Sequence, residues 1–147
     1  MKVSYIQKFL LLFAAFLMLS HIAQAQKGKK KLAEEYYQGF EFEKAAEIFE
    51  DALKIDHNDI FALKRAAECR KNIGDYAKAE EHLEVLATQS LVRAEDLLIY
   101  ADILKIQKKY DKALMVYEKY MQMKPNDKFI KKYLTTDNWA YEIVRDS

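Results

Sequence analysis

The sequence has few of the residues that form disulfide bonds, sharp turns and catalytic loops. It holds one cysteine, one proline and three glycines among 147 residues. Cys69 has no partner for a disulfide within the chain, so apolar burial must hold the fold together. We interpret Cys69 as a small packing residue, with an intermolecular bridge or a reactive thiol as the alternatives. Three glycines are also too few for a glycine-rich phosphate loop or a dinucleotide-binding turn.

An excess of charge of one sign is absent as well. Lys and Arg number 24, and Asp and Glu number 23, which gives a formal net charge of +1. A near-neutral chain with interspersed charges gives no support for nucleic-acid binding and is typical of a solvated helical surface. The one dense basic run, residues 27–31, is interpreted as a polar segment that leads into the first helix. Contact with an anionic surface is the alternative.

Long apolar runs are absent except near the N-terminus. Residues 9–19 form an eleven-residue apolar run after Lys2 and Lys8, and the sequence AQA follows at 23–25. This order is that of a secretory signal peptide, and the run is shorter than the roughly 20 residues that span a membrane. We therefore predict a signal peptide over residues 1–25 and an exported, periplasmic or outer-membrane-associated chain without a membrane span. An uncleaved anchor is the alternative.

Catalytic and metal-binding motifs are also absent. His57 and His82 are the only histidines after the predicted signal peptide, and neither forms an HExxH or Cys/His cluster. His57 lies in a turn with Asp56 and Asp59, which we interpret as helix-capping acids, with a metal site as the alternative. Neighbouring carboxylates on a helix point in different directions, and the few serines have no nucleophile-elbow motif. We predict a non-enzymatic protein with no catalytic residue, metal or cofactor.

What the sequence does have is an internal repeat. Ala45, Ala79 and Ala113 lie 34 residues apart. Four further positions keep similar residues in each copy: Ala33, Ala67 and Ala101; Phe42, Tyr76 and Tyr110; Phe49, Leu83 and Tyr117; Ala52, Leu86 and Tyr120. The last three sets share one helix face with the central alanine. Small residues on two successive helices suit an antiparallel pair that crosses at short distance, and such pairs must stack to bury their apolar faces.

In this register the chain resembles the tetratricopeptide repeat (TPR) family, whose unit is a 34-residue helix pair. The units are 26–59, 60–93 and 94–127. Some residues depart from the family pattern: Lys29 at a large-residue place, Arg70 at a tyrosine place, Leu86 and Tyr120 at alanine places, and His57 and Leu91 at proline places, where only Pro125 conforms. We expect a late or frayed start of the first helix and adjusted packing at Arg70.

The resemblance implies an all-α, right-handed solenoid of three antiparallel helix pairs with a C-terminal capping helix. We expect helices near 29–40, 43–55, 60–72, 76–89, 94–107 and 110–123, separated by turn-compatible residues. Residues 128–147 are predicted to form a capping helix and a tail. We expect the third unit to be covered by Phe129, Ile130, Tyr133 and Leu134. The apolar tail residues either fold back or belong to an interface or a longer architecture: Trp139, Tyr141, Ile143 and Val144.

The resemblance also implies a concave binding surface. In TPR proteins four positions of each first helix line the groove, and here they carry Lys27, Lys30, Glu34 and Tyr37; Phe61, Lys64, Glu68 and Lys71; Glu95, Leu98, Asp102 and Lys105. We predict that the partner-binding residues are Tyr37, Phe61, Lys64, Glu68, Lys71, Leu98, Asp102 and Lys105. Mixed charges with apolar side chains suit a protein or peptide segment. An exposed polar face without a partner is the alternative.

Some TPR domains clamp the terminal carboxylate of a chaperone, and the sequence argues against such a clamp. Only Lys30 matches its five places, and the others hold Glu34, Arg65, Glu95 and Ile99. The signal, repeats and tail resemble the N-terminal part of exported envelope proteins in which a TPR block precedes a beta-propeller and an outer membrane protein A-like, peptidoglycan-binding domain. This implies an outer-membrane or peptidoglycan-associated complex, and some such proteins serve type IX secretion.

We therefore predict a protein-interaction scaffold of the bacterial cell envelope that binds no nucleic acid. Neither the propeller nor the peptidoglycan-binding domain lies within these 147 residues, so their activities are not assigned to the chain. Two alternatives stay open. One is a structural segment that self-associates, and the other is a truncated N-terminal part of a larger envelope or secretion-associated protein.

Overall fold

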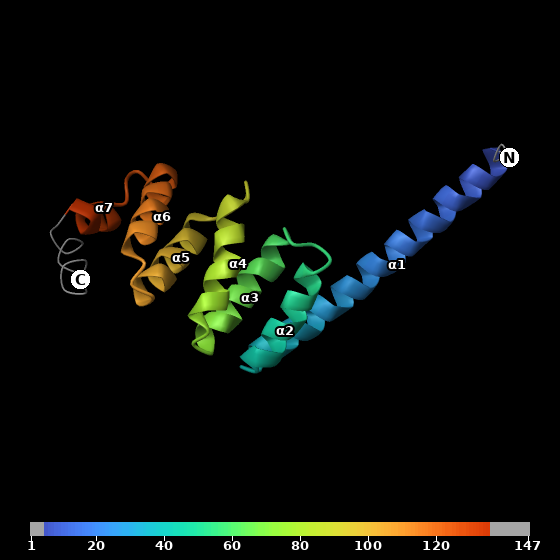
Figure 1. Ribbon diagram of the computed structural model, residues 1–147, viewed down its shortest axis with the longest axis horizontal. Helices are drawn as coiled ribbons and strands as arrows, with labels where there is room; N and C mark the ends of the chain where they lie inside the picture. The colour runs from blue at the N-terminus through green and yellow to red at the C-terminus, as the bar shows by residue number, and fades with distance from the viewer. Residues whose placement is uncertain (1–4, 136–147) are drawn as a thin grey trace.

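The computed structural model describes residues 5–135, and these form seven α-helices and no strand. In chain order the helices are α1 (Tyr5–Gln38), α2 (Phe42–Leu53), α3 (Ile60–Asn72), α4 (Tyr76–Thr88), α5 (Ala94–Ile106), α6 (Tyr110–Met123) and α7 (Lys128–Thr135). The first six make three antiparallel pairs that stack in chain order into a right-handed solenoid (Figure 1). Apart from the start of α1, every predicted helix end lies within two residues of the observed one.

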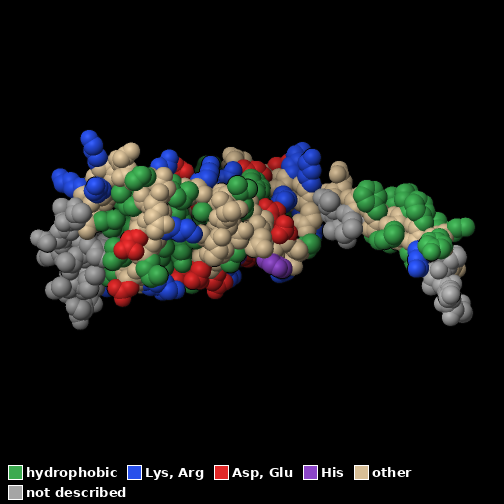
Figure 2. Space-filling view, turned by 90° about the horizontal axis from the view of Figure 1, so that it is seen from above, with side chains coloured by type: hydrophobic (Ala, Val, Ile, Leu, Met, Phe, Trp, Pro, Cys, Tyr) green, Lys and Arg blue, Asp and Glu red, His purple; other side chains and the backbone are tan. Residues whose placement is uncertain are grey.

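The start of α1 differs from the sequence-based expectation. The helix begins at Tyr5 and passes Lys29 without a break, so the expectation of a late or frayed start is wrong. No proline interrupts this stretch, and a single glycine such as Gly28 costs a helix only about 1 kcal/mol. The first half of α1 projects from the solenoid (Figure 1) and exposes many apolar side chains (Figure 2). Among residues 5–135, no helix combines the length and apolar character needed to cross a membrane.

Small residues allow the helices of each pair to approach closely. The six alanines predicted at the helix crossings are each at most 1% exposed: Ala33, Ala45, Ala67, Ala79, Ala101 and Ala113. Larger side chains fill the space around them, chiefly Phe49, Leu97, Ile103 and Leu104. Leu86 and Tyr120, which stand where the family has alanine, are buried in the same core. The core therefore accepts the departures from the family pattern by enclosing the larger side chains.

The turn inside each pair repeats one backbone conformation. Phe40, Gly74 and Lys108 lie 34 residues apart and have φ angles of 61°, 80° and 60°. Glycine adopts this left-handed conformation freely, whereas other residues lose about 1–2 kcal/mol. The amide of the next residue donates back to the preceding helix and closes a Schellman motif. These bonds are Glu41 N to Tyr36 O at 2.9 Å, Asp75 N to Arg70 O at 2.8 Å and Lys109 N to Leu104 O at 2.8 Å.

The short helix α7 lies at the C-terminal end of the solenoid, beyond α6 (Figure 1). Ile130 is buried and Leu134 packs against the core, as expected of a capping helix. Phe129 is 77% exposed, so the prediction that it covers the third unit is wrong. Asp127 accepts hydrogen bonds from the amides of Phe129 and Ile130, and Phe129 lies at the edge of a surface depression and not in the core. The side chain of Tyr133 and the tail residues Trp139, Tyr141, Ile143 and Val144 lie outside the described residues.

Candidate functional site

The first helices of the three pairs, α1, α3 and α5, are linked side chain to side chain across the inner surface of the solenoid. Arg65 Nη2 of α3 donates to Glu34 Oε1 of α1 at 2.8 Å. Lys64 Nζ of α3 donates to Asp96 Oδ1 of α5 at 2.8 Å. We call this surface the groove and define it by Glu34, Tyr37, Phe61, Lys64, Arg65, Glu68 and Asp96. The stacking thus joins residues that lie about one repeat apart in the sequence.

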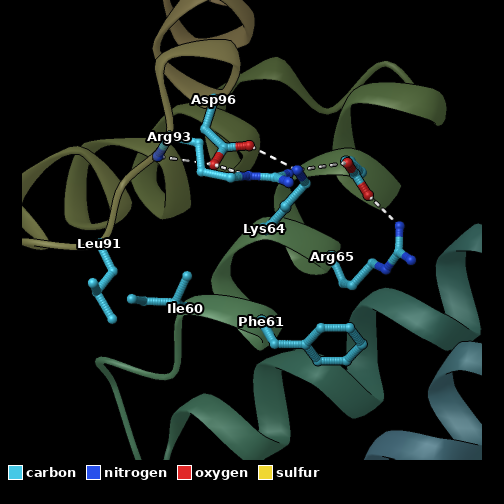
Figure 3. Close-up of a pocket in the computed structure, with 8 residues that line it drawn as sticks. Ile60, Phe61, Lys64, Arg65, Leu91, Arg93 and Asp96 are labelled. Atoms are coloured by element: carbon cyan, nitrogen blue, oxygen red, sulfur yellow. Dashed lines mark hydrogen bonds and ion pairs between the residues drawn. The ribbon is translucent and has the colours of Figure 1, made fainter. Parts of the chain in front are cut away.

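A depression of about 610 Å³ opens on the groove between α3 and α5 (Figure 3). It is lined by Ile60, Phe61, Lys64, Arg65, Glu68, Leu91, Arg93 and Asp96. Three of the predicted binding residues, Phe61, Lys64 and Glu68, therefore lie together. Ile60 at the start of α3 and Leu91 in the loop after α4 form an apolar rim, and Leu91 is 74% exposed.

The charged side chains around the depression pair with one another. Arg65 Nη1 donates to Glu68 Oε2 at 2.7 Å, and Lys64 Nζ lies 4.0 Å from Glu68 Oε1. Arg93 Nε lies 3.5 Å from Asp96 Oδ2. Asp96 is 3% exposed, and although burial acts to raise its pKa, the bonds from Lys64 and Arg93 hold the pKa below its ordinary value. Lys64 and Glu68 are thus engaged within the protein itself.

Two aromatic rings flank the guanidinium of Arg65. Its central carbon lies 4.3 Å from the ring centroid of Tyr37 and 5.6 Å from that of Phe61, both within cation–π range. Phe61 also packs edge-on against Phe49 at 5.8 Å and keeps 44% of its surface exposed. Burial and the nearby Glu68 carboxylate raise the pKa of Tyr37. The groove therefore presents a partly exposed aromatic surface, in which contacts with Phe49 and Arg65 hold the ring of Phe61 in place.

The remaining predicted residues lie outside this depression. Leu98, Asp102 and Lys105 line a second one of about 370 Å³ with Tyr117, Asp127, Phe129 and Ile130. Tyr117 donates from its hydroxyl to Asp102 Oδ1 at 3.3 Å. Lys71 is exposed near the end of α3 and lines neither depression. Seven of the eight predicted residues thus divide between the groove and the second depression, and Lys71 belongs to neither.

Four residues that line the depression were not predicted as binding residues, namely Ile60, Leu91, Arg93 and Asp96, while Arg65 was considered only for the carboxylate clamp. Asp96 did carry a signal, because it is the third residue of a helix and accepts the Arg93 amide at 3.4 Å in a capping box. The exposed rim formed by Leu91 depends on the loop conformation, and the absence of proline at this place was its one signal in the sequence.

Arg70 forms a second charged cluster, away from the groove. Its side chain is 4% exposed, and Nε and Nη2 donate to Glu50 Oε1 and Oε2 at 2.6 and 2.7 Å. Nη1 donates to Glu43 Oε1 at 2.8 Å, and His82 Nε2 lies 3.1 Å from Glu50 Oε1. Burial acts to raise the pKa of Glu50, but the hydrogen bonds from Arg70 and His82 outweigh it and lower the pKa. The adjusted packing expected at Arg70 is thus an ion cluster joining α2, α3 and α4.

The candidate reactive residues have structural roles or lie in turns. Cys69 is fully buried, and burial raises the pKa of its thiol to about 12, as suits a packing residue. Asp59 accepts the Ala62 amide at 3.1 Å, which confirms that it caps α3. His57 is exposed in the turn before that cap. Within residues 5–135, no group of three or more His, Cys, Asp or Glu side chains is placed to hold a metal ion.

Comparison with known proteins agrees with this architecture. The model of the tetratricopeptide repeat family matches residues 97–127. The chain has a TPR fold. No curated protein sequence matches it.

Solved TPR structures superpose over most of the chain. The Yersinia enterocolitica type III secretion chaperone SycD, in complex with a peptide of the translocator YopD, has a TM-score of 0.62 at 18% identity over 83% of this chain and 92% of that one. The first TPR of Spaghetti (RPAP3), bound to an HSP90 peptide, has a TM-score of 0.65 at 14% identity, over 80% and 94%. The first TPR domain of human RPAP3 has a TM-score of 0.63 at 12% identity, over 82% and 93%. At these identities the likeness shows the fold.

Proposed function

We propose that the protein is a non-enzymatic interaction scaffold that binds a protein or peptide segment through the groove. The observation that carries this proposal is the depression between α3 and α5, in which Phe61 remains 44% exposed although its ring is held in place. Its volume of about 610 Å³ lies within the usual range of ligand pockets. The SycD and RPAP3 structures, each with a bound peptide, support a peptide as the occupant.

The proposal does not extend to a terminal carboxylate clamp. Lys30, the one residue that matches such a clamp, donates to Asp59 at 2.6 Å and is engaged at the start of α3. Glu34 and Glu68 place further negative charge beside the groove, which disfavours a carboxylate. We therefore expect an internal segment of a partner rather than its C-terminus.

Capture from an envelope extract of the source cells tests this function. We expect the protein to retain a specific partner and the variants Phe61→Ala and Leu98→Ala to lose it, because each removes apolar contact area from the inner surface. Met115→Ala and Ile55→Ala are matched controls, since both side chains are more than half exposed and line neither depression. Equal capture by all four variants would remove the groove from consideration.

We also propose that the scaffold is exported and acts in the cell envelope, within an outer-membrane or peptidoglycan-associated complex. The first half of α1 exposes many apolar side chains, and this supports the proposal. An apolar helix that stays exposed to water is typical of a segment that is cleaved off or bound by the export machinery. N-terminal sequencing of the protein from fractionated cells is expected to begin at Gln26. Recovery of an intact Met1 from the cytosol would contradict export.

Self-association is a second candidate function, favoured by apolar side chains at the C-terminal end of the solenoid. Phe129 is 77% exposed and Met123 is 43% exposed. In this case light scattering finds a dimer or larger species that Phe129→Ser converts to a monomer. A monomer at high protein concentration would exclude this candidate.

A further inference from the structure

We infer that the groove selects an uncharged, extended peptide segment with a bulky apolar side chain that lies against Phe61 and Leu91, and that this binding is insensitive to salt. The inference rests on the proposed function and names the chemical class of the partner. It follows from the apolar rim, the charge balance and two unpartnered polar atoms of the groove.

The apolar rim combines residues from the beginning and the end of the second repeat unit. Ile60 and Phe61 begin α3, and Leu91 belongs to the loop between α4 and α5. Figure 3 shows the side chains of Ile60 and Leu91 directed toward one another, with Phe61 farther along the same side of the depression. Leu91 stands at a proline place of the repeat and leaves 74% of its side chain in solvent. An apolar ligand side chain placed here covers surface that the protein itself leaves open.

The charge balance disfavours a strongly charged ligand. Three cations, Lys64, Arg65 and Arg93, face three anions, Glu34, Glu68 and Asp96, so the formal charge of this set is zero. Each member lies within 3.5 Å of an opposite charge. A charged ligand group gains little from such a set, because it meets both signs and must break an existing pair to form a new one.

The polar contribution of the ligand is matched by one donor and one acceptor. Arg65 Nε and Glu34 Oε2 are buried and have no hydrogen-bond partner. Both atoms belong to the Arg65–Glu34 ion pair, whose side chains are 22% and 28% exposed. A peptide group offers one N–H and one C=O, and a buried polar atom without a partner favours any group that satisfies it. A neutral peptide backbone can approach this pair without breaking it, whereas a charged side chain competes with one of its members.

The test uses pools of short synthetic peptides with capped termini and the purified protein. All pools carry Leu, Ile, Met, Val or Phe at two positions. The other positions are Ser, Thr, Asn and Gln in the neutral pool, Asp and Glu in the acidic pool, and Lys and Arg in the basic pool. We expect the neutral pool to yield the tightest binders. Their Kd is expected to change by less than about twofold between roughly 0.05 and 0.5 M salt, because screening acts on charge–charge attraction.

Matched variants distinguish the contribution of the apolar rim to binding from general effects of a mutation on the protein. Leu91→Ser is expected to lower the affinity for the neutral peptides by about tenfold, which is typical of the loss of a central apolar contact. Phe61→Leu keeps an apolar side chain against Phe49 and is expected to lower this affinity less. Met115→Ser is expected to leave the affinity unchanged. A preference for a charged pool, a loss of affinity in salt, or normal binding by Leu91→Ser would overturn the inference and leave the proposed function standing. Failure of all pools to bind would contradict the proposed function itself.

Discussion

Two arginines on α3, five residues apart, sit in opposite settings. Arg65 lies in the groove with 22% of its side chain exposed and bonds Glu34 and Glu68. Arg70 is 4% exposed and bonds the partly buried Glu50 and the exposed Glu43. The chemistry of the two clusters is similar, because each guanidinium donates hydrogen bonds to two carboxylates. Their burial differs, and burial decides what each cluster does.

The comparison shows how one helix serves both the fold and recognition. Water reaches the partly exposed pairs of Arg65 more easily than the 4% exposed side chain of Arg70, so we expect the Arg65 pairs to contribute less to stability and to rearrange around a ligand. Arg70 has lost its water, so removal of its partners leaves a charge in the interior. We therefore expect Arg70 to act on stability and Arg65 to act on binding.

The largest effect is expected for Arg70→Met. This change leaves Glu50, itself only 22% exposed, beside an apolar side chain, and we expect the free energy of unfolding to fall by about 3 kcal/mol. Urea denaturation measures the loss. The double variant Arg70→Met with Glu50→Met removes both charges and is expected to recover much of the stability. A loss below about 1 kcal/mol in the single variant would show that the cluster does not hold the fold.

The pH dependence of stability separates the two clusters next. Glu50 has a pKa below its ordinary 4.5 in the folded protein, so the folded state binds fewer protons than the unfolded state. The stability this provides is present above pH 4.5 and is lost as the pH falls through the folded pKa. We expect Arg70→Met to flatten this acid loss. Arg65→Met should keep it, since the bonds that lower the pKa of Glu50 and Asp96 remain. Denaturation at a series of acidic pH values compares them.

A smaller effect is expected in the turn beside Arg70. Gly74 has a φ of 80°, and a Cβ added there meets no atom within 4 Å. Gly74→Ala therefore costs only the backbone conformation, about 1 kcal/mol by thermal or urea unfolding. The control is Ala77→Gly, an exposed position in α4 without a left-handed backbone. Peptide binding should not change in Gly74→Ala, and weakened binding would show that the two faces of α3 are coupled.

The smallest effect on stability is expected for Arg65→Met. Its ion pairs are partly exposed, so we expect a loss of about 0.5 kcal/mol or less. Binding of neutral peptides should weaken, because the guanidinium that supports Phe61 and Tyr37 is gone. Chemical denaturation and peptide titration of the same sample give both numbers. A large loss of stability without a change in binding would reverse the roles of the two arginines.

The sequence predicts the fold well because its repeat acts through local rules. The alanines at the helix crossings recur every 34 positions, and so do the positions of the turns. Once the register of one unit is known, the positions of the helices in the other units follow. The start of α1 escaped prediction, since the apolar N-terminal run and the first repeat are both helix-forming and nothing ends the helix between them. The left-handed Phe40 and Lys108 were also hidden, because neither residue type signals that conformation.

The site was predicted only in part. The family positions identified Phe61, Lys64 and Glu68, which do share a depression. The ion pairs were missed because their partners are distant in sequence: Glu34 and Arg65 lie 31 residues apart, and Lys64 and Asp96 lie 32 apart. That separation is close to one repeat. Opposite charges at this spacing on successive first helices therefore predict ion pairs between neighbouring repeat units.

A partner segment is expected to bind the inner surface formed by α1, α3 and α5 without contact to the outer helices. Hydrogen exchange of the purified protein, with and without its tightest neutral peptide, tests this most directly. We predict slower exchange on binding in α3, in α5 and in the loop around Leu91, with α2, α4 and α6 unchanged. Protection confined to α2, α4 and α6, or to α7, would contradict the account.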